Sequence, residues 1–330
     1  MQKGRFLCAA PLVLALSVVF SLTGQAAELI PMGQAVGIEA KTDGLLVTEL
    51  AEIDTPEGKR APAKEGGVKP GDVIRSVAGR EVHTAEDLAA ALETVDKKTT
   101  IVVDRGGLEK KCVVTPWRDE AGKLQLGLWL RDGITGIGTV TYCDPATGEY
   151  GALGHGITDE EEGKLLPIES GSIVQADISG AHRGEAGEPG ELTGTFTGAE
   201  PFGSVEENSV FGIFGTLNET PAIAPVDTAP DEQVHTGAVT IRATVDGRET
   251  ADYAATIDRI YRENGCTRYL ITVTDEALLQ QTGGIVQGMS GSPILQDGRL
   301  VGAVTHVLLG DAARGYGLSI DTMRAAQEAA

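Results

Sequence analysis

Closely spaced β-like runs dominate the chain from Trp117 onward. They are separated by turns rich in Gly and Asp, and they include KLQLGLWL, ITGIGTVTY, GSIVQADI, GAVTIRATV, TRYLITVT and RLVGAVTHV. Short strands at such spacing are typical of a β-barrel or sandwich. The dipeptide Asp297-Gly298 is a strong signal for a two-residue hairpin. The region therefore predicts a mainly β structure.

Composition supports this and narrows the possible partners. The 330 residues include 44 glycines and only 4% aromatic residues, a balance that favours β-structure with many turns, and the length suggests about two domains. The formal charge of −21 makes nucleic acid a poor partner. No CxxC motif and no Cys or His pair at zinc-ligand spacing occurs, so neither a metal nor a cofactor is expected.

Residues 1–27 form an export segment. Lys3 and Arg5 precede an apolar run at 6–22, which small residues follow. The run is near the shortest length that spans a bilayer, so a cleaved signal peptide and an uncleaved N-terminal membrane anchor both fit. In either case we expect the body of the protein outside the cytosol.

Residues 28–116 are predicted to form a PDZ domain, leaving 117–330 for a second domain. Four β-like runs surround one helix, which starts with Thr84 as N-cap and Asp87 as its capping partner. The turn GGVKPGDVI at 66–74 resembles the loop of a PDZ domain, and the element order resembles the circularly permuted type found in bacterial proteases.

In PDZ domains an extended peptide adds as a strand to a sheet edge, and a terminal carboxylate sits in a nest of backbone N–H groups. We expect the corresponding loop at the start of this domain, formed by Gly33, Gln34, Ala35, Val36, Gly37 and Ile38. The stretch departs from the usual glycine-leucine-glycine-phenylalanine pattern. The departure weakens the expectation of carboxylate capture but not that of strand addition.

The segment GMSGSP at 288–293 has the form G-x-S-G-x-P of the nucleophile loop in chymotrypsin-like proteases. A serine hydroxyl needs a base, an orienting acid and donors for the oxyanion before it can attack a peptide bond. The motif favours Ser290 over Ser292 as nucleophile. Its glycines let the amides of Gly288 and Ser290 point at one oxygen.

Five histidines could supply the base. His155 ends an apolar strand between two glycines and precedes Ser290, the order of chymotrypsin-like enzymes, so it is the predicted base. His306 lies on the strand predicted to follow Ser290. We expect it to line the substrate pocket, and it is the alternative base.

At this point the sequence resembles the SpoIVB-type serine peptidases of endospore-forming bacteria. The resemblance runs through nearly the whole chain in the family's order, in the segments ELIPMGQ at 28–34, ITGIGTVT at 134–141, GALGHG at 151–156, TGGIVQGMSGSP at 282–293 and GAVTHV at 302–307. It implies a signal or anchor segment at 1–27, a PDZ domain at 28–116 and a chymotrypsin-like double β-barrel peptidase domain at 117–330.

The resemblance also implies that His155 and Ser290 are catalytic and that Asp275 is the acid. Chymotrypsin-like enzymes generally take the acid from the first barrel, far from the serine, so Asp227 and Asp252 are alternatives. Met289 stands where the common pattern has an aspartate that pairs with a newly freed N-terminus. Activation by that ion pair is therefore not expected.

The implied function is that of an exported, self-cleaving signalling protease of sporulation. It would act between the forespore and mother cell membranes and cleave a membrane-bound regulator of an intramembrane protease that activates a late sigma factor. The alternatives are a non-catalytic PDZ adaptor and a general extracytoplasmic quality-control protease. The sequence leaves open the cleavage specificity and whether the PDZ domain recruits or inhibits.

Overall fold

A computed structural model describes residues 27–159, 163–184, 187–196 and 200–329. The export segment expected at 1–27 lies outside these ranges except for Ala27. Within them, no helix is both long enough and apolar enough to cross a membrane.

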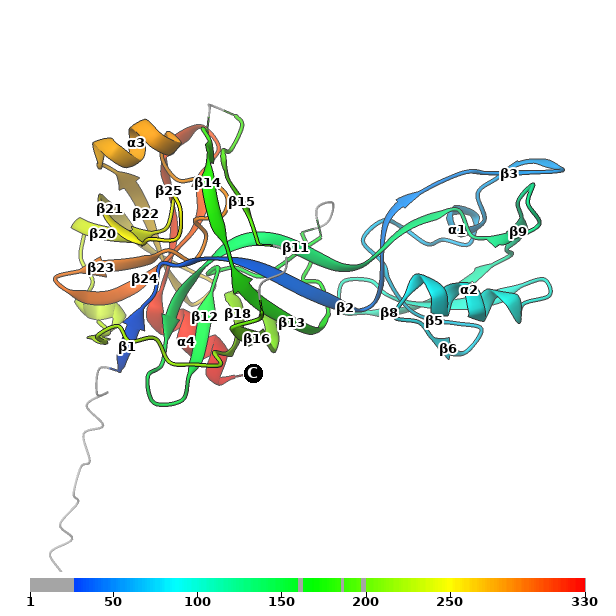
Figure 1. The fold of residues 1–330 in the computed structure, drawn as a ribbon, viewed down its shortest axis with the longest axis horizontal. Helices are drawn as coiled ribbons and strands as arrows, with labels where there is room; N and C mark the ends of the chain where they lie inside the picture. The colour runs from blue at the N-terminus through cyan, green and yellow to red at the C-terminus, as the bar shows by residue number, and fades with distance from the viewer. Residues whose placement is uncertain (1–26, 160–162, 185–186, 197–199, 330) are drawn as a thin grey trace, which may run out of the picture.

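The chain forms two lobes, with the PDZ domain on the right of Figure 1 and two β-domains on the left. The first β-domain uses parts of two long strands, β2 (Ala35–Leu50) and β11 (Leu128–Cys143). Its shorter strands are β1 (Glu28–Pro31), β12 (Glu149–Ala152), β13 (Ile168–Gln175), β16 (Gly203–Val205), β17 (Glu207–Ser209), β18 (Gly212–Thr216) and β19 (Val226–Asp227). A separate hairpin of β14 (Asp177–His182) and β15 (Glu191–Thr195) extends from it.

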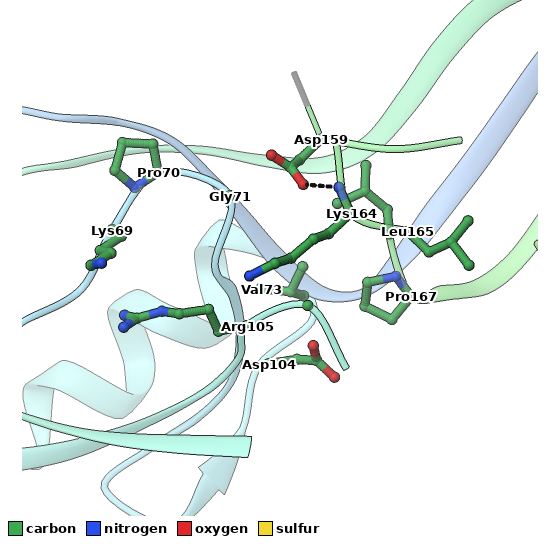
Figure 2. Close-up of a pocket in the computed structure, with 12 residues that line it drawn as sticks. Lys69, Pro70, Gly71, Val73, Asp104, Arg105, Asp159, Lys164, Leu165 and Pro167 are labelled. Atoms are coloured by element: carbon green, nitrogen blue, oxygen red, sulfur yellow. Dashed lines mark hydrogen bonds between the residues drawn. The ribbon is translucent and has the colours of Figure 1, made fainter. Parts of the chain in front are cut away.

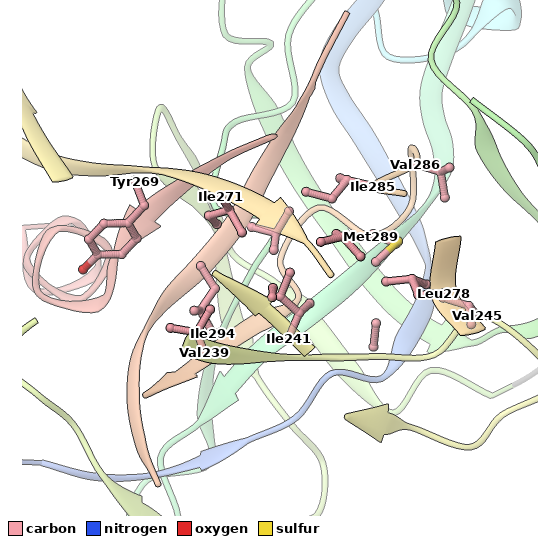
Figure 3. Close-up of a cluster of buried hydrophobic side chains, with 14 of the residues drawn as sticks. Val239, Ile241, Val245, Tyr269, Ile271, Leu278, Ile285, Val286, Met289 and Ile294 are labelled. Atoms are coloured by element: carbon pink, nitrogen blue, oxygen red, sulfur yellow. The ribbon is translucent and has the colours of Figure 1, made fainter. Parts of the chain in front are cut away.

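The second β-domain is a closed barrel in the order β20-β21-β22-β25-β24-β23. Its elements are β20 (Gly237–Ala243), β21 (Ala251–Glu263), β22 (Cys266–Val273), α3 (Glu276–Thr282), β23 (Pro293–Gln296), β24 (Arg299–Leu308), β25 (Asp311–Ser319) and α4 (Ile320–Glu328), preceded by the short helix η1 (Asp231–Gln233). Alternate residues of the strands fill its core, among them Val239, Ile241, Ile271 and Ile294 (Figure 3). The expected double barrel is thus one closed barrel and one open half-barrel, as far as the described strands pair.

The PDZ domain contains the predicted helix, α2 (Ala85–Glu93), with Thr84 and Asp87 forming the expected capping box. Its other elements are β3 (Ile53–Thr55), β4 (Gly58–Arg60), α1 (Pro62–Glu65), β5 (Val73–Val77), β6 (Arg80–Glu81), β7 (Thr99–Asp104), β8 (Glu109–Val114), β9 (Trp117–Arg118) and β10 (Leu124–Gln125). Leu88 and Leu92 of α2 pack in a core with Leu45 and Leu126.

Two long strands, β2 and β11, connect the PDZ domain to the first β-domain. Strands β2 and β11 pair antiparallel from Leu50 opposite Leu128 to Ala35 opposite Thr139, so both run from one lobe to the other. The PDZ domain is therefore inserted into a hairpin of the first β-domain. This differs from the expected division at residue 116, because β1 and the start of β2 pair with β11, β13 and β19, which follow that residue in the sequence.

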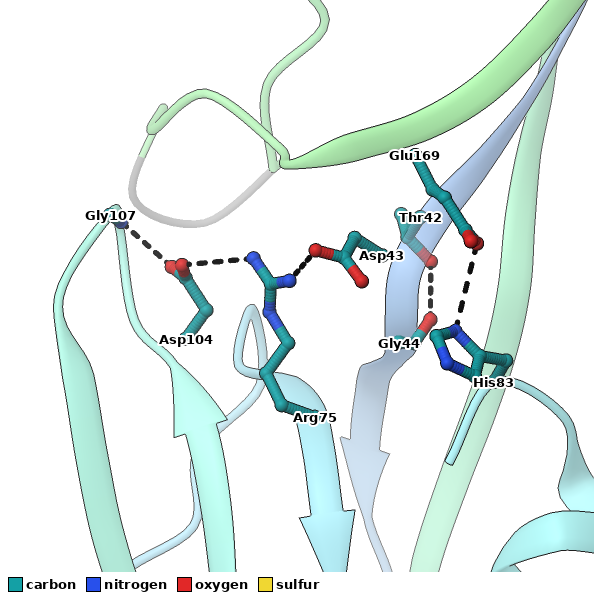
Figure 4. Close-up of polar contacts among 8 residues, drawn as sticks. All are labelled: Thr42, Asp43, Gly44, Arg75, His83, Asp104, Gly107 and Glu169. Carbon is teal, nitrogen blue, oxygen red and sulfur yellow. Dashed lines mark hydrogen bonds and ion pairs between the residues drawn. The ribbon is translucent and has the colours of Figure 1, made fainter. Parts of the chain in front are cut away.

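Polar contacts surround the point where β2 enters the PDZ domain (Figure 4). Arg75 of β5 forms ion pairs with Asp43 of β2 and with Asp104 at the end of β7. His83 of the PDZ domain lies with its Nδ1 3.6 Å from a carboxylate oxygen of Glu169 in β13. The contact between His83 and Glu169 thus adds a side-chain link between the lobes to the two continuous strands.

A small pocket lies beside this junction (Figure 2). Lys69, Pro70 and Gly71 of the PDZ domain line one side, and Asp159 and Lys164 from the segment after His155 line the other. The backbone N–H of Lys164 donates to the Asp159 carboxylate over 2.8 Å, which shapes this segment. The PDZ domain therefore contacts the chain a few residues beyond the predicted base.

Candidate active site

Ser290 lies in the loop between α3 and β23. Two glycines beside it adopt the left-handed backbone region, Gly288 with φ 92° and Gly291 with φ 97°, a conformation that other residues adopt only with strain. A Cβ at Gly291 would overlap the carbonyl oxygen of Thr139 and contact the backbone N of Leu153. This glycine is therefore the point where the two β-domains come together closely enough to share one site.

The peptide group that ends at the Gly288 nitrogen is held by the hairpin of β14 and β15. The N–H of Leu192 donates to the carbonyl of Gln287 over 2.8 Å. Because a peptide group is planar, holding its carbonyl also sets the direction of the Gly288 N–H. The Leu192 side chain packs over Gly288, so close that an added Cβ would lie 3.0 Å from it.

The next amide of interest, that of Ser290, is oriented from within the loop. The carbonyl of Met289 accepts a hydrogen bond of 2.9 Å from the N–H of Ser292. Among the hydrogen bonds found in the described ranges, none is donated by the N–H of Gly288 or of Ser290. Two oriented and unused donors beside a serine hydroxyl are the requirement for an oxyanion hole.

Thr139 of β11 joins the nucleophile loop to the first β-domain, and sequence reasoning gave this residue no role. Its side-chain hydroxyl donates to the carbonyl of Gly288 over 2.7 Å, and its N–H donates to the carbonyl of Ser290 over 3.0 Å. Its own carbonyl accepts from the N–H of Leu153 over 3.1 Å. The sequence contains the run ITGIGTVTY, but no local pattern in it indicates that Thr139 contacts Gly288, a residue 149 positions away.

His155 follows β12 through a tight turn. Leu153 has φ 69°, an unusual conformation for a residue with a side chain, and Gly154 has φ 69° as well. The imidazole Nδ1 lies 2.9 Å from the carbonyl oxygen of Gly156. If Nδ1 carries the proton, the ring donates to that carbonyl and Nε2 keeps its lone pair. Burial lowers the pKa of His155, and the Gly156 carbonyl opposes the shift.

Ser290, His155 and His306 line one pocket of about 530 Å³. The Ser290 hydroxyl donates to the carbonyl of Thr305 over 2.6 Å, so it points to β24 and not to His155. The rings of His155 and His306 lie side by side with centroids 4.5 Å apart. Desolvation by the surrounding protein, with a contribution from His155, lowers the pKa of His306 to about 4, although the residue is exposed at the surface of the pocket.

The three aspartates considered as the acid lie elsewhere. Asp275 is the N-cap of α3, where its carboxylate accepts from the N–H groups of Ala277 and Leu278 over 3.0 Å each. Hydrogen bonds from backbone N–H groups, most of all that of Leu278, lower the pKa of Asp275. Asp252 pairs with Arg242 over 2.7 Å, and Asp227 is exposed in β19. The bond to Gly156 is the only one that the described residues offer to the His155 ring.

The stretch Gly33 to Ile38, expected as the PDZ peptide-binding loop, lies in the first β-domain instead. Its strand portion is paired on both sides, with β11 through 136–139 and with β13 through 173–175. Gly33 packs against Arg242 of the second barrel. With both edges occupied, this stretch cannot accept a peptide strand, and Ile38 lines the pocket of Ser290.

The connection between β10 and β11 has the properties expected of the peptide-binding loop. Leu126 is buried in the core that includes α2, and Gly127 turns the chain with φ 71°. The strand that follows, from Leu128 to Arg131, pairs with β2 on one edge, and no described strand pairs with the other. In the sequence, the Leu-Gly-Leu of KLQLGLWL is the pattern that indicates this loop.

No metal centre forms among the described residues, because no three His, Cys, Asp or Glu side chains converge.

A histidine at the end of one β-domain and a serine with two unused amides in the neighbouring barrel share one pocket, and this arrangement defines a serine peptidase of the chymotrypsin-like class. The family comparison agrees: the model of the SpoIVB peptidase S55 family matches residues 122–324. The chain belongs to the SpoIVB peptidase S55 family. A PDZ domain model matches residues 53–105, within the inserted lobe.

Solved structures with a related chain path include the inactive form of Rv3671c protease, at 16% identity and a TM-score of 0.37, covering 58% of this chain and 82% of that one. The active form from M. tuberculosis has 16% identity and a TM-score of 0.36, covering 60% and 74%. No curated protein matches the chain.

Proposed function

We propose that this chain is an exported, self-cleaving serine endopeptidase that acts as a signalling protease of sporulation. It works between the forespore and mother cell membranes and cleaves a membrane-associated regulator of sigma-factor processing. Membership in the SpoIVB peptidase family supports this role. The export segment at 1–27 supports the location, as either a cleaved signal or an anchor.

One observation carries the chemistry: Ser290 and His155 face one pocket beside the unused amides of Gly288 and Ser290. On substrate binding the Ser290 hydroxyl leaves the Thr305 carbonyl and turns to His155. Nε2 of His155 takes the hydroxyl proton while Oγ bonds to the substrate carbonyl carbon, and the two amides hold the resulting oxyanion.

The protonated His155 then donates its proton to the departing amine, and the peptide bond breaks. A water molecule repeats the sequence on the acyl-enzyme: His155 takes a proton from the water as its oxygen bonds to the acyl carbon, and then returns that proton to Ser290 Oγ as the bond between Oγ and the acyl carbon breaks. The Gly156 carbonyl, held on Nδ1–H, keeps the ring in the orientation that both steps need. This assigns to a backbone carbonyl the orienting role that was expected of Asp275.

The PDZ domain binds a peptide by strand addition at the free edge of β11, from Leu128 to Arg131. Leu128 and Leu130 pack against the core that includes Leu88 and Leu92 of α2, so this edge runs beside the helix. Because β11 continues into the first β-domain as far as Cys143, a bound peptide is tied to the catalytic half through one continuous strand.

The test uses the chain from Ala27 onward, which retains every described element, and a fluorophosphonate probe. We expect labelling of the wild type and none for Ser290→Ala or His155→Gln. Ser292→Ala is the matched control, because the Ser292 hydroxyl is buried without a hydrogen-bond partner in the described structure and should not be needed.

Self-cleavage should follow the labelling in every variant. If wild type and Ser290→Ala behave alike, the serine peptidase proposal fails and the non-catalytic PDZ adaptor is favoured. Broad degradation of an unfolded protein, in place of one or a few cuts, would favour the quality-control protease.

A further inference from the structure

The pocket beside Ser290 has apolar walls. Side chains from both β-domains line it, namely Ile137, Leu153, Ile285, Val286, Val307 and Leu309. Among the described residues that line it, none is Lys, Arg, Asp or Glu. A charged group placed there would lose its water without gaining a partner, which is strongly unfavourable.

Two branched residues narrow the part of this pocket that belongs to the second barrel. Ile285 reaches toward β25, where a Cβ added to Gly315 would lie 2.6 Å from its Cδ1. Val307 of β24 pairs with the same glycine. The N–H of Ile285 donates to the carbonyl of Ala312 over 2.8 Å, which fixes this wall. Ile285 and Val307 therefore pack against β25 and form a fixed wall that limits the size of the group the pocket can take.

We propose that this pocket selects the substrate residue whose carbonyl Ser290 attacks, and that it takes an uncharged aliphatic side chain of valine to leucine size. The inference rests on the proposed function, because it needs Ser290 to attack a peptide bond. The Cα that carries this side chain is bonded directly to the attacked carbonyl carbon, so the side chain must enter the space that adjoins Ser290 and the segment from Ile285 to Gly288.

The experiment compares peptidyl phosphonate probes that differ only in the side chain at this position: Ala, Val, Leu, Phe, Lys and Asp. Labelling rates of the chain from Ala27 onward are measured for each. We expect the Val and Leu probes to react at least about tenfold faster than the Lys and Asp probes, and faster than the Phe probe.

Two variants alter the walls in opposite ways. Ile285→Ala enlarges the pocket, so the rate with the Phe probe should rise relative to the Leu probe. Val307→Asp, at a half-buried site, introduces a carboxylate, so the Lys probe should gain relative to the Leu probe. Val113→Asp is the matched control, because Val113 is 50% exposed in the PDZ domain and should not change the order of the probes.

The outcomes separate the two proposals. A fluorophosphonate without such a side chain that labels Ser290, together with equal rates for all peptidyl probes or a preference for Lys, Asp or Phe, overturns the pocket assignment and leaves the peptidase standing. No labelling by any probe overturns both. Unaltered ratios in Val307→Asp, with a folded protein by circular dichroism, also reject the pocket.

Discussion

The backbone around Ser290 and that around His155 are held in different ways. On the serine side, hydrogen bonds fix successive peptide groups, and Thr139 and Leu192 of the other β-domain supply three of them. On the histidine side, the imidazole bonds to the carbonyl of the next residue, Gly156. Tertiary contacts therefore order the two amides proposed for the oxyanion hole, while the turn that contains His155 positions the proposed base.

Loss of the close approach at Gly291 should have the largest effect. Gly291→Ala forces a methyl group onto the Thr139 carbonyl, so we expect a loss of at least about 3 kcal/mol of stability and no labelling of Ser290. Gly298→Ala is the control, because it shares a positive φ of 77° but has nothing within 4 Å. It should cost only about 1 kcal/mol in denaturant unfolding. Equal costs would show that the domains do not depend on this contact.

Thr139 tests the hydrogen bonds that hold the loop around Ser290. Thr139→Val leaves the buried Gly288 carbonyl without its 2.7 Å donor, so stability should fall by about 1–3 kcal/mol and the labelling rate by roughly tenfold. Thr141 on the same strand is equally buried, yet its hydroxyl has no hydrogen-bond partner in the described structure. Thr141→Val should therefore be neutral or stabilising. A normal rate in Thr139→Val would remove its assigned role.

Asp275 tests whether the histidine side needs a carboxylate. Asp275→Ala removes the cap of α3 and should cost about 1 kcal/mol of stability. Asp275→Ser can still cap the helix, so it should recover most of this loss and keep near-normal labelling. If Asp275 orients His155, both variants should instead lose about 10⁴-fold in rate.

The pH profile should show the smallest effect. Catalysis needs neutral His155, and burial lowers its pKa from the usual value of 6.5. As the pH falls below 6.5, the labelling rate should therefore stay constant at first and decrease only in more acid solution. His306→Gln should leave that midpoint in place. If His306 is the base, the midpoint should lie near its pKa of about 4, and His306→Gln should abolish labelling.

Local features were predictable from the residues alone. The capping box of α2 is confirmed, and so is the Asp297-Gly298 hairpin, whose two residues have φ of 52° and 77°. Each depends on hydrogen bonds or backbone freedom within a few residues, which a short motif specifies.

Features that depend on distant pairing were not predictable in this way. A strand that is paired on both edges and a strand with one free edge have similar sequences. This is why Gly33 to Ile38 was assigned to the PDZ domain, while the free edge after Gly127 was overlooked. The insertion of the PDZ domain into the β2–β11 hairpin has the same cause.

By itself, the sequence determined the family, the β-rich class and the two residues proposed for the chemistry, because a G-x-S-G-x-P loop and a glycine-flanked histidine are local patterns. Only the tertiary structure decided which groups surround them. The link through Thr139 and the apolar walls of the pocket arise where segments more than a hundred residues apart come into contact, and the turn after β12 decides that the Gly156 carbonyl meets the His155 ring. Such contacts are set by packing and hydrogen bonding across the whole fold, which no short segment encodes.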